Sequence, residues 1–165
     1  MNKVISFLFA SAVVVSLTYC SGTVKTTESK SNTVKGLKDY YKDYFPIGVA
    51  VTPRQLHGED SALIVDHFNS LTAENAMKMG PIHPRENEYN WKDGDSIAFF
   101  AKKHGLKLRG HNLCWHSQAP SWMFTNEKGE PVTKEVLLQR LKDHITTVVK
   151  HYKDYVYGWD VVCIS

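Results

Sequence analysis

The sequence predicts an α/β fold in which parallel β-strands alternate with helices that pack outside the sheet. Four apolar segments of strand length alternate with three segments of helical periodicity, in the order β-α-β-α-β-α-β. The long connections at residues 75–92 and 112–132 follow strands and are rich in Trp, His, Asn and Gln, as in barrels with sites at the strand ends. The first strand–helix junction lacks a glycine-rich phosphate loop, which argues against a nucleotide-binding sheet. The pattern alone does not separate an open sheet from part of a barrel.

The first strand–helix–strand unit is predicted between residues 47 and 75. Residues 47–51 form a short apolar run, which is typical of a buried strand. Residues 60–69 carry apolar side chains at helical spacing, and Asp60 or Ser61 can cap that helix. Residues 70–75 are the second strand candidate.

The next helix and strand are predicted from residue 93 onward. Residues 93–104 show a helical stripe, with Asp93 as a candidate cap and Gly105 as the stop. Residues 106–115 then form the third strand.

The clearest helix is predicted at residues 133–152, with Thr133 as its cap. Its apolar side chains recur at three- and four-residue steps: Leu137, Leu141, Ile145, Val148 and Tyr152. Residues 155–162 form the fourth strand.

The N-terminal residues have the features of an export signal. Residues 4–17 are uncharged and strongly apolar, which is too short a run to span a bilayer. The segment ending at Cys20 resembles a bacterial lipoprotein box, so residues 1–19 are expected to be removed and Cys20 lipidated. The mature protein would then be an exported lipoprotein anchored to the membrane, in the periplasm or at the cell surface. Tyr19 stands where a small residue is usual, and secretion after cleavage elsewhere is the alternative.

Residues 20–36 are rich in Ser, Thr and Lys and are interpreted as a flexible tether to a folded part at residues 37–165. The net charge of the whole chain is only +3, which gives no reason to expect a nucleic-acid partner. Its 12% aromatic content argues against disorder, and its 3 cysteines cannot form a disulfide scaffold.

A first candidate site follows the second predicted strand. Glu74, Asn75 and Lys78 place a carboxylate, an amide and an ammonium close together. Sugar hydroxyl groups need hydrogen-bond donors and acceptors at once, which this set supplies. A plain salt bridge between Glu74 and Lys78 is the alternative.

A second candidate site follows the third predicted strand. Strand alternation puts Arg109 and His111 on one face, and Asp160 is the candidate partner for the arginine. Trp115 could form an aromatic wall there, or simply pack in the core.

Two other chemistries are weak alternatives. A zinc site from His111, Cys114 and His116 matches no standard ligand spacing. No serine elbow, cysteine–histidine pair or metal-binding helix is present.

Three segments together resemble glycoside hydrolase family 10, the retaining endo-1,4-β-xylanases. They read TAENAMK at 72–78, RGHNLCWHSQAPSWMF at 109–124 and YGWDVV at 157–162. The likeness runs from about residue 37 to 162. It implies a (β/α)₈ TIM barrel, here limited to about the first four strands and three helices.

The resemblance also implies roles. Xylan or xylo-oligosaccharides are the expected ligands, with no cofactor and no metal. The positions that match the family's substrate contacts are Glu74, Asn75, Lys78, His111, Trp115 and Gln118. By the same resemblance His116 has an orienting role, and Trp122 is a supporting aromatic residue with core packing as its main task.

The resemblance fails where the family carries its catalytic carboxylates. The general acid/base glutamate is expected at the position of Ile164, after an asparagine at that of Cys163. The family's nucleophile lies beyond Ser165. Retaining hydrolysis needs two carboxyl groups, so the chain as given is expected to be inactive. A non-catalytic xylan-binding lipoprotein and a truncated gene remnant are the alternative interpretations.

Overall fold

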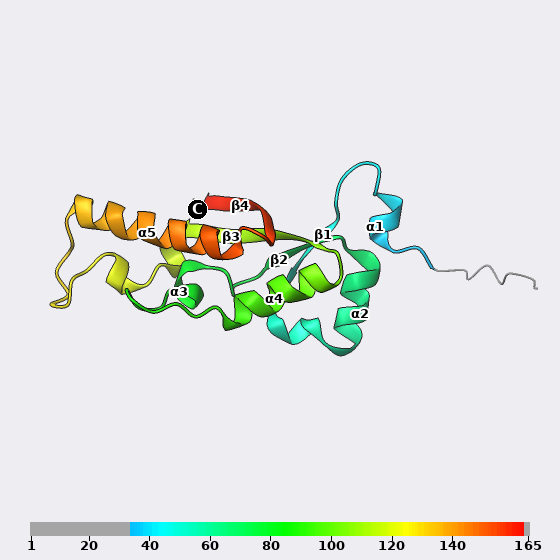
Figure 1. Cartoon of the computed structure of the whole chain (residues 1–165), viewed down its shortest axis with the longest axis horizontal. Helices are drawn as coiled ribbons and strands as arrows, with labels where there is room; N and C mark the ends of the chain where they lie inside the picture. Colours follow the sequence, from blue (N-terminus) through cyan, green and yellow to red (C-terminus); the bar gives the residue numbers. More distant parts are fainter. Residues whose placement is uncertain (1–33, 164–165) are drawn as a thin grey trace, which may run out of the picture. The chain divides into compact units, whose positions relative to one another are not determined.

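A computed structural model describes residues 34–163 as one four-stranded parallel sheet with helices packed on it (Figure 1). The strands lie in chain order, which is the arrangement that the alternating pattern predicts. They are β1 (Gly48–Val51), β2 (Ser70–Ala73), β3 (Lys107–Trp115) and β4 (Val156–Cys163). The predicted leader with Cys20, most of the predicted tether, and Ile164 lie outside the described residues.

The three predicted helices are confirmed, and two short ones add to them. The long helices are α2 (Gly58–His67), α4 (Lys92–Lys103) and α5 (Lys134–Tyr152). The short ones are α1 (Leu37–Tyr40) and α3 (Met79–Ile82). Three 3₁₀ turns lie in the connections: η1 (Pro53–Leu56), η2 (His116–Gln118) and η3 (Ser121–Met123). Single turns of helix carry too little periodicity to stand out in the sequence.

Helix ends were predicted with mixed success. Thr133 caps α5 as expected, because its side-chain oxygen accepts a hydrogen bond from the backbone of Val136. Gly105 ends α4 with a φ of 65°, a left-handed conformation that glycine adopts without strain. The predicted cap Asp93 is wrong: α4 begins one residue earlier, and Asp93 lies in its first turn. A carboxylate there still favours the helix dipole.

The predicted caps of α2 are also wrong. This helix begins at Gly58 with His57 as its N-cap, so Asp60 and Ser61 lie inside it.

Strand pairing explains where β2 stops. The register pairs Val51 of β1 with Ala73 of β2, and no further pair follows. Glu74 and Asn75, which the sequence assigned to the strand, therefore leave the sheet at its carboxyl edge. This is the edge at which parallel α/β folds hold their ligands.

Alternate residues of β3 divide the sheet into a covered and an open face. Leu108, Gly110 and Asn112 are buried, whereas Arg109 is exposed and His111 is half-buried. The core lies between the covered face and the helices, and its fully buried members include Leu71, Ile97, Leu108, Val148 and Tyr152.

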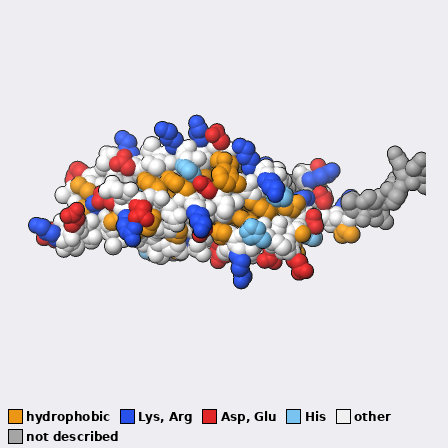
Figure 2. Space-filling model, turned by 60° about the horizontal axis from the view of Figure 1, so that its bottom comes forward, with side chains coloured by type: hydrophobic (Ala, Val, Ile, Leu, Met, Phe, Trp, Pro, Cys, Tyr) orange, Lys and Arg blue, Asp and Glu red, His pale blue; other side chains and the backbone are white. Residues whose placement is uncertain are grey.

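The surface of the described part carries charges of both signs. Figure 2 shows Lys and Arg interspersed with Asp and Glu over one face, with apolar side chains between them. Within residues 34–163, no helix is both long and apolar enough to cross a membrane.

Candidate functional site

The structure brings together four predicted residues from the connections after β2 and β3. Lys78 is buried, and its Nζ donates a hydrogen bond to Oδ1 of Asn75 at 2.9 Å. The same Nζ lies 4.9 Å from the centre of the Trp115 ring, within cation–π range. Nε2 of Gln118 donates to the same Asn75 oxygen at 3.4 Å. Asn75 is thus the acceptor that links the two connections.

Glu74 stands apart from this group. Its side chain is exposed, and the structure gives it no ion pair with Lys78 among the described residues. Lys78 bonds Asn75 instead. The salt-bridge interpretation of this motif is therefore wrong, and the Glu74 carboxylate is available to a ligand.

A second group lies on the open face of the sheet. Arg109 donates to both carboxylate oxygens of Asp160, and Nδ1 of His111 lies 3.0 Å from Oδ2 of the same carboxylate. Arg109 and His111 therefore share a face, and Asp160 is the arginine's partner, as predicted. The hydrogen bond from Arg109 is the main reason that the pKa of Asp160 is lowered, with burial acting against it.

The aromatic residues of the second motif differ in their surroundings. The indole N–H of Trp115 is buried and has no hydrogen-bond partner among residues 34–163. His116 is exposed and lies edge-on to Trp115, with 6.2 Å between the ring centres. Trp122 is half-buried, and its Nε1 donates to the backbone oxygen of His83 at 3.0 Å.

The two connections also touch through their backbones. A Cβ at Gly80 would lie 2.9 Å from the backbone oxygen of Gln118, closer than real Cβ atoms approach. Only glycine lets the segment after Lys78 pass this close to Gln118.

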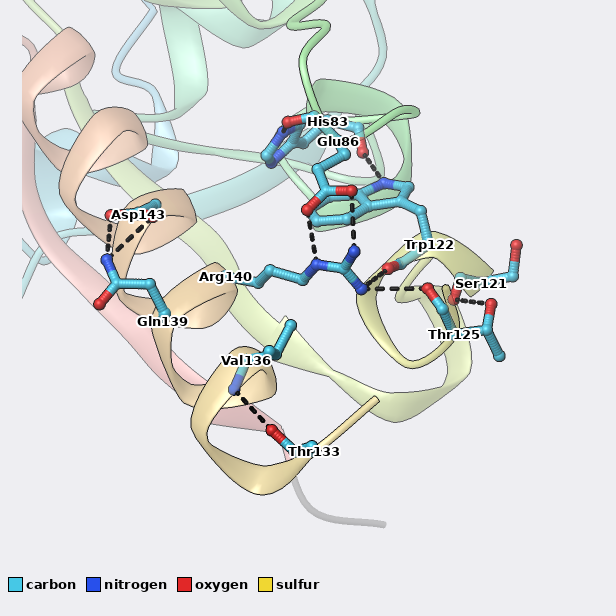
Figure 3. A network of polar contacts seen from close by, with 10 residues as sticks. All are labelled: His83, Glu86, Ser121, Trp122, Thr125, Thr133, Val136, Gln139, Arg140 and Asp143. Carbon is cyan, nitrogen blue, oxygen red and sulfur yellow. Dashed lines mark hydrogen bonds and ion pairs between the residues drawn. The ribbon is translucent and has the colours of Figure 1, made fainter. Parts of the chain in front are cut away.

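A network of polar contacts around Arg140 was not predicted from the sequence (Figure 3). Arg140 of α5 pairs with Glu86, and Nδ1 of His144 lies 3.1 Å from Nδ1 of His83. Arg140 and His144 fall on the apolar stripe of α5 at helical spacing, and this is the signal that could have revealed them. Their partners lie 54 and 61 residues away in the sequence.

Burial keeps this histidine pair neutral. It lowers the pKa of His144 to about 4, with a further contribution from His83. Burial is also the main reason that the pKa of His83 is lowered.

The zinc alternative finds no support in the described residues. They contain no group of three His, Cys, Asp or Glu side chains placed to hold a metal ion. Cys114 lies apart from His111, in an apolar cavity of about 210 Å³ between β3 and α5, and burial raises the pKa of its thiol.

The combined set can bind a polyhydroxylated ligand. Lys78 offers hydrogen-bond donors, Glu74 offers an acceptor, and Gln118 offers both. The Trp115 ring supplies an apolar surface beside them. Only one carboxylate, that of Glu74, is free of an ion pair in this set.

Comparisons with known proteins agree on one family. Residues 36–163 match the model of glycosyl hydrolase family 10. An endo-1,4-beta-xylanase/feruloyl esterase of Xylanibacter ruminicola is 57% identical over 128 residues, which are 77% of this chain and 18% of that protein. The crystal structure of an endo-1,4-beta-xylanase from Caldicellulosiruptor owensensis is similar with a TM-score of 0.76 at 47% identity, covering 78% of this chain and 39% of that one.

A second similar structure contains a sugar. A variant of the xylanase from Thermoanaerobacterium saccharolyticum, in complex with xylotriose, has a TM-score of 0.74 at 42% identity and covers 79% of this chain and 44% of that one. The chain thus spans less than half the length of each of these relatives. The likeness confirms the barrel family that the sequence motifs imply, which the strand pattern alone left open.

Proposed function

Because this chain belongs to glycosyl hydrolase family 10, we propose that its site binds xylan or xylo-oligosaccharides. The observation that carries the proposal is the grouping of Asn75, Lys78, Trp115 and Gln118 within one set of contacts. The xylotriose complex of a similar xylanase supports the ligand class.

Each proposed contact follows from its chemistry. The buried Lys78 ammonium has one bond to Asn75 and retains donors for sugar hydroxyls. Glu74 accepts from hydroxyl groups. The ring of Trp115 provides an apolar surface for a sugar, and His111, held by Asp160, faces the open side of the sheet.

Binding is tested with xylotriose and the full 165-residue chain. We expect Lys78→Met and Glu74→Gln each to weaken binding, because each removes a hydrogen-bonding group from the site. The control is Glu88→Gln, which removes an exposed carboxylate paired with Arg85, outside the site. Equal affinity in all four proteins, measured by calorimetry, would contradict the proposal.

The proposed reaction of a complete family 10 domain is retaining hydrolysis of internal β-1,4-xylosidic bonds. This reaction needs a nucleophile and an acid/base carboxyl group roughly 5 Å apart. Among the proposed sugar contacts only Glu74 has a carboxylate, and Asp160 is already engaged by Arg109 and His111. Position 164, where the resemblance expects the acid/base, is isoleucine.

We therefore propose that these 165 residues by themselves bind xylan without hydrolysing it. General acid–base catalysis typically contributes ~10²–10⁴-fold, and the nucleophile's contribution would also be absent. The test is a reducing-sugar assay on soluble xylan, beside a Glu74→Ala control. Sugar release that scales with the wild-type chain and disappears in the control would contradict this and identify Glu74 as a catalytic carboxylate.

We further propose export and lipidation at Cys20, with residues 1–19 removed. The support is the uncharged apolar run that precedes Leu17–Cys20. Mass spectrometry of the mature protein tests it: an unmodified Cys20, or another N-terminus, would favour plain secretion.

A further inference from the structure

One arginine side chain contacts both connections that carry the proposed sugar contacts (Figure 3). Nε and Nη2 of Arg140 donate to the carboxylate of Glu86 at 2.6 and 2.8 Å. Nη1 donates to the backbone oxygens of Trp122 at 2.5 Å and Thr125 at 3.0 Å. Glu86 belongs to the connection after β2, and the other two residues belong to the connection after β3. A planar guanidinium with five donors suits such a junction, whereas a lysine does not.

The arginine end of these contacts is sheltered from water, whereas the glutamate end is not. The side chain of Arg140 is 14% exposed and that of Glu86 is 46% exposed, so the part-buried contacts of Arg140 are those with the backbone oxygens of Trp122 and Thr125. Exposed pairs contribute little because water screens them. All four acceptors lie outside α5.

The first connection transmits this restraint to Lys78. Nε1 of Trp122 donates to the backbone oxygen of His83. The ring of His83 also contacts His144 of α5. His83 ends α3, with its backbone N–H bonded to Met79 at 2.8 Å. Lys78 directly precedes Met79, so one turn of helix separates the restrained residue from the sugar contact.

The second connection transmits it to Gln118. Trp122 lies in η3, and Pro120, whose φ is fixed near −71°, leads into that turn from Gln118. The contact of Gln118 with Asn75 is long, at 3.4 Å, and is the contact that a small separation of the two connections would break first.

We infer that Arg140 is a positioning residue of the proposed sugar site, because its guanidinium holds the two connections at the separation that Asn75, Lys78 and Gln118 require. The inference rests on the proposed function for its ligand. Arg140 does not touch the site residues themselves, and it acts through Glu86, Trp122 and Thr125.

A neighbour on the same helix supplies a matched control. Gln139 precedes Arg140, and its side chain bonds only Asp143, one turn further along α5, at 2.9 and 3.0 Å. Gln139→Ala therefore removes two hydrogen bonds that do not reach either connection.

The experiment measures xylotriose affinity and the side-chain amide resonance of Gln118 in the full chain. The proteins are wild type, Arg140→Met, Arg140→Lys and Gln139→Ala. We expect Arg140→Met to weaken binding about three- to tenfold, the effect of losing roughly one net hydrogen bond. Arg140→Lys should recover part of that loss, and Gln139→Ala should bind as wild type does. The Gln118 resonance should move in the two arginine variants, even without ligand.

A purely stabilising role predicts a different result. Arg140→Met would then lower the unfolding midpoint but leave the affinity and the Gln118 resonance of the folded protein unchanged, and this would overturn the inference. If Arg140→Met does not fold, the affinity and the Gln118 resonance of Arg140→Lys and Trp122→Phe distinguish the two roles in the same way. A wild-type chain that binds no xylotriose contradicts the proposed function, and the Gln118 resonance in the variants without ligand then decides the positioning role.

Discussion

At the scale of the residue, Asp160 determines what His111 can offer a ligand. A carboxylate only accepts hydrogen bonds, so Nδ1 of His111 must carry the proton that it shares with Oδ2 over 3.0 Å. Nε2 is then the ring nitrogen left for a ligand on the open face. Arg109 pairs with the same carboxylate, so Asp160 links the arginine to the histidine.

The buried histidine pair makes stability depend on pH. The folded pKa of His144 is about 4 against a reference of 6.5, so the unfolded chain binds the proton more readily. The contribution of His144 to the free energy of unfolding is fully present above pH 6.5 and is lost as the pH drops toward 4. The loss is up to roughly 3 kcal/mol, at about 1.4 kcal/mol per pKa unit. His144→Gln should flatten this slope in urea unfolding measured from pH 7 to 4.

The exposed His57 is the control for that titration. His57→Gln should keep the wild-type slope. An unchanged slope in His144→Gln would mean that the pair is not the source. The pKa of Asp160 is also lowered. Its contribution to stability is therefore also lost as the pH falls, but in a more acidic range, below the usual pKa of a carboxyl group.

Gly80 gives a residue-scale test of how close the two connections lie. Gly80→Ala places a methyl group 2.9 Å from the backbone oxygen of Gln118, so the backbone must move. We expect a stability loss of about 1–3 kcal/mol from overpacking, together with weaker xylotriose binding.

Gly48→Ala is its control, because a Cβ there has ordinary contacts of 3.6 Å and longer with Ser70. Wild-type affinity in Gly80→Ala would show that the spacing of the connections does not matter for binding.

At the scale of the element, α5 combines a capped start with a face that holds the site in place. Thr133 Oγ1 accepts from the backbone N–H of Val136, while Arg140 and His144 point toward the connections. A substitution that loosens the first turn of α5 would therefore also disturb the contacts of Arg140 and His144.

The cap can be tested by itself. Thr133→Ala should lower the free energy of unfolding by about 1 kcal/mol, the usual contribution of such a cap. Thr133→Ser retains the oxygen and should stay near wild type. Chemical denaturation of the three proteins at pH 7 measures the difference, and equal midpoints would show that the cap adds nothing here.

At the scale of the whole molecule, the sheet exposes apolar side chains along β4. Tyr157, Val161 and Val162 are each more than half exposed, and β4 has a neighbour on one side only among the described strands. An uncovered, apolar edge strand invites pairing between molecules. The chain studied alone is therefore expected to self-associate as its concentration rises.

Val162→Lys should reduce that association, because a charge on an edge strand opposes pairing. Val136→Lys, which changes an exposed residue of a helix and not of the edge strand, is the control. Light scattering across a concentration series measures both. A wild-type chain that stays monomeric and unfolds reversibly would show that the edge is harmless.

The sequence by itself determined the order of the strands and long helices, because apolar periodicity reports which face of each element is buried. It also located Asn75, Lys78, Trp115 and Gln118, through motifs that resemble a known family. Local periodicity carries no information on partners that are far apart in the chain. It also missed the short helix α3.

Only the tertiary structure decided which side chains meet. Lys78 bonds Asn75 instead of Glu74, and this choice depends on how the backbone leaves β2. The contact of Arg140 with Glu86 spans 54 residues, and it exists because α5 packs across the ends of two connections. Such contacts depend on the packing of whole elements, which no local pattern of residues specifies.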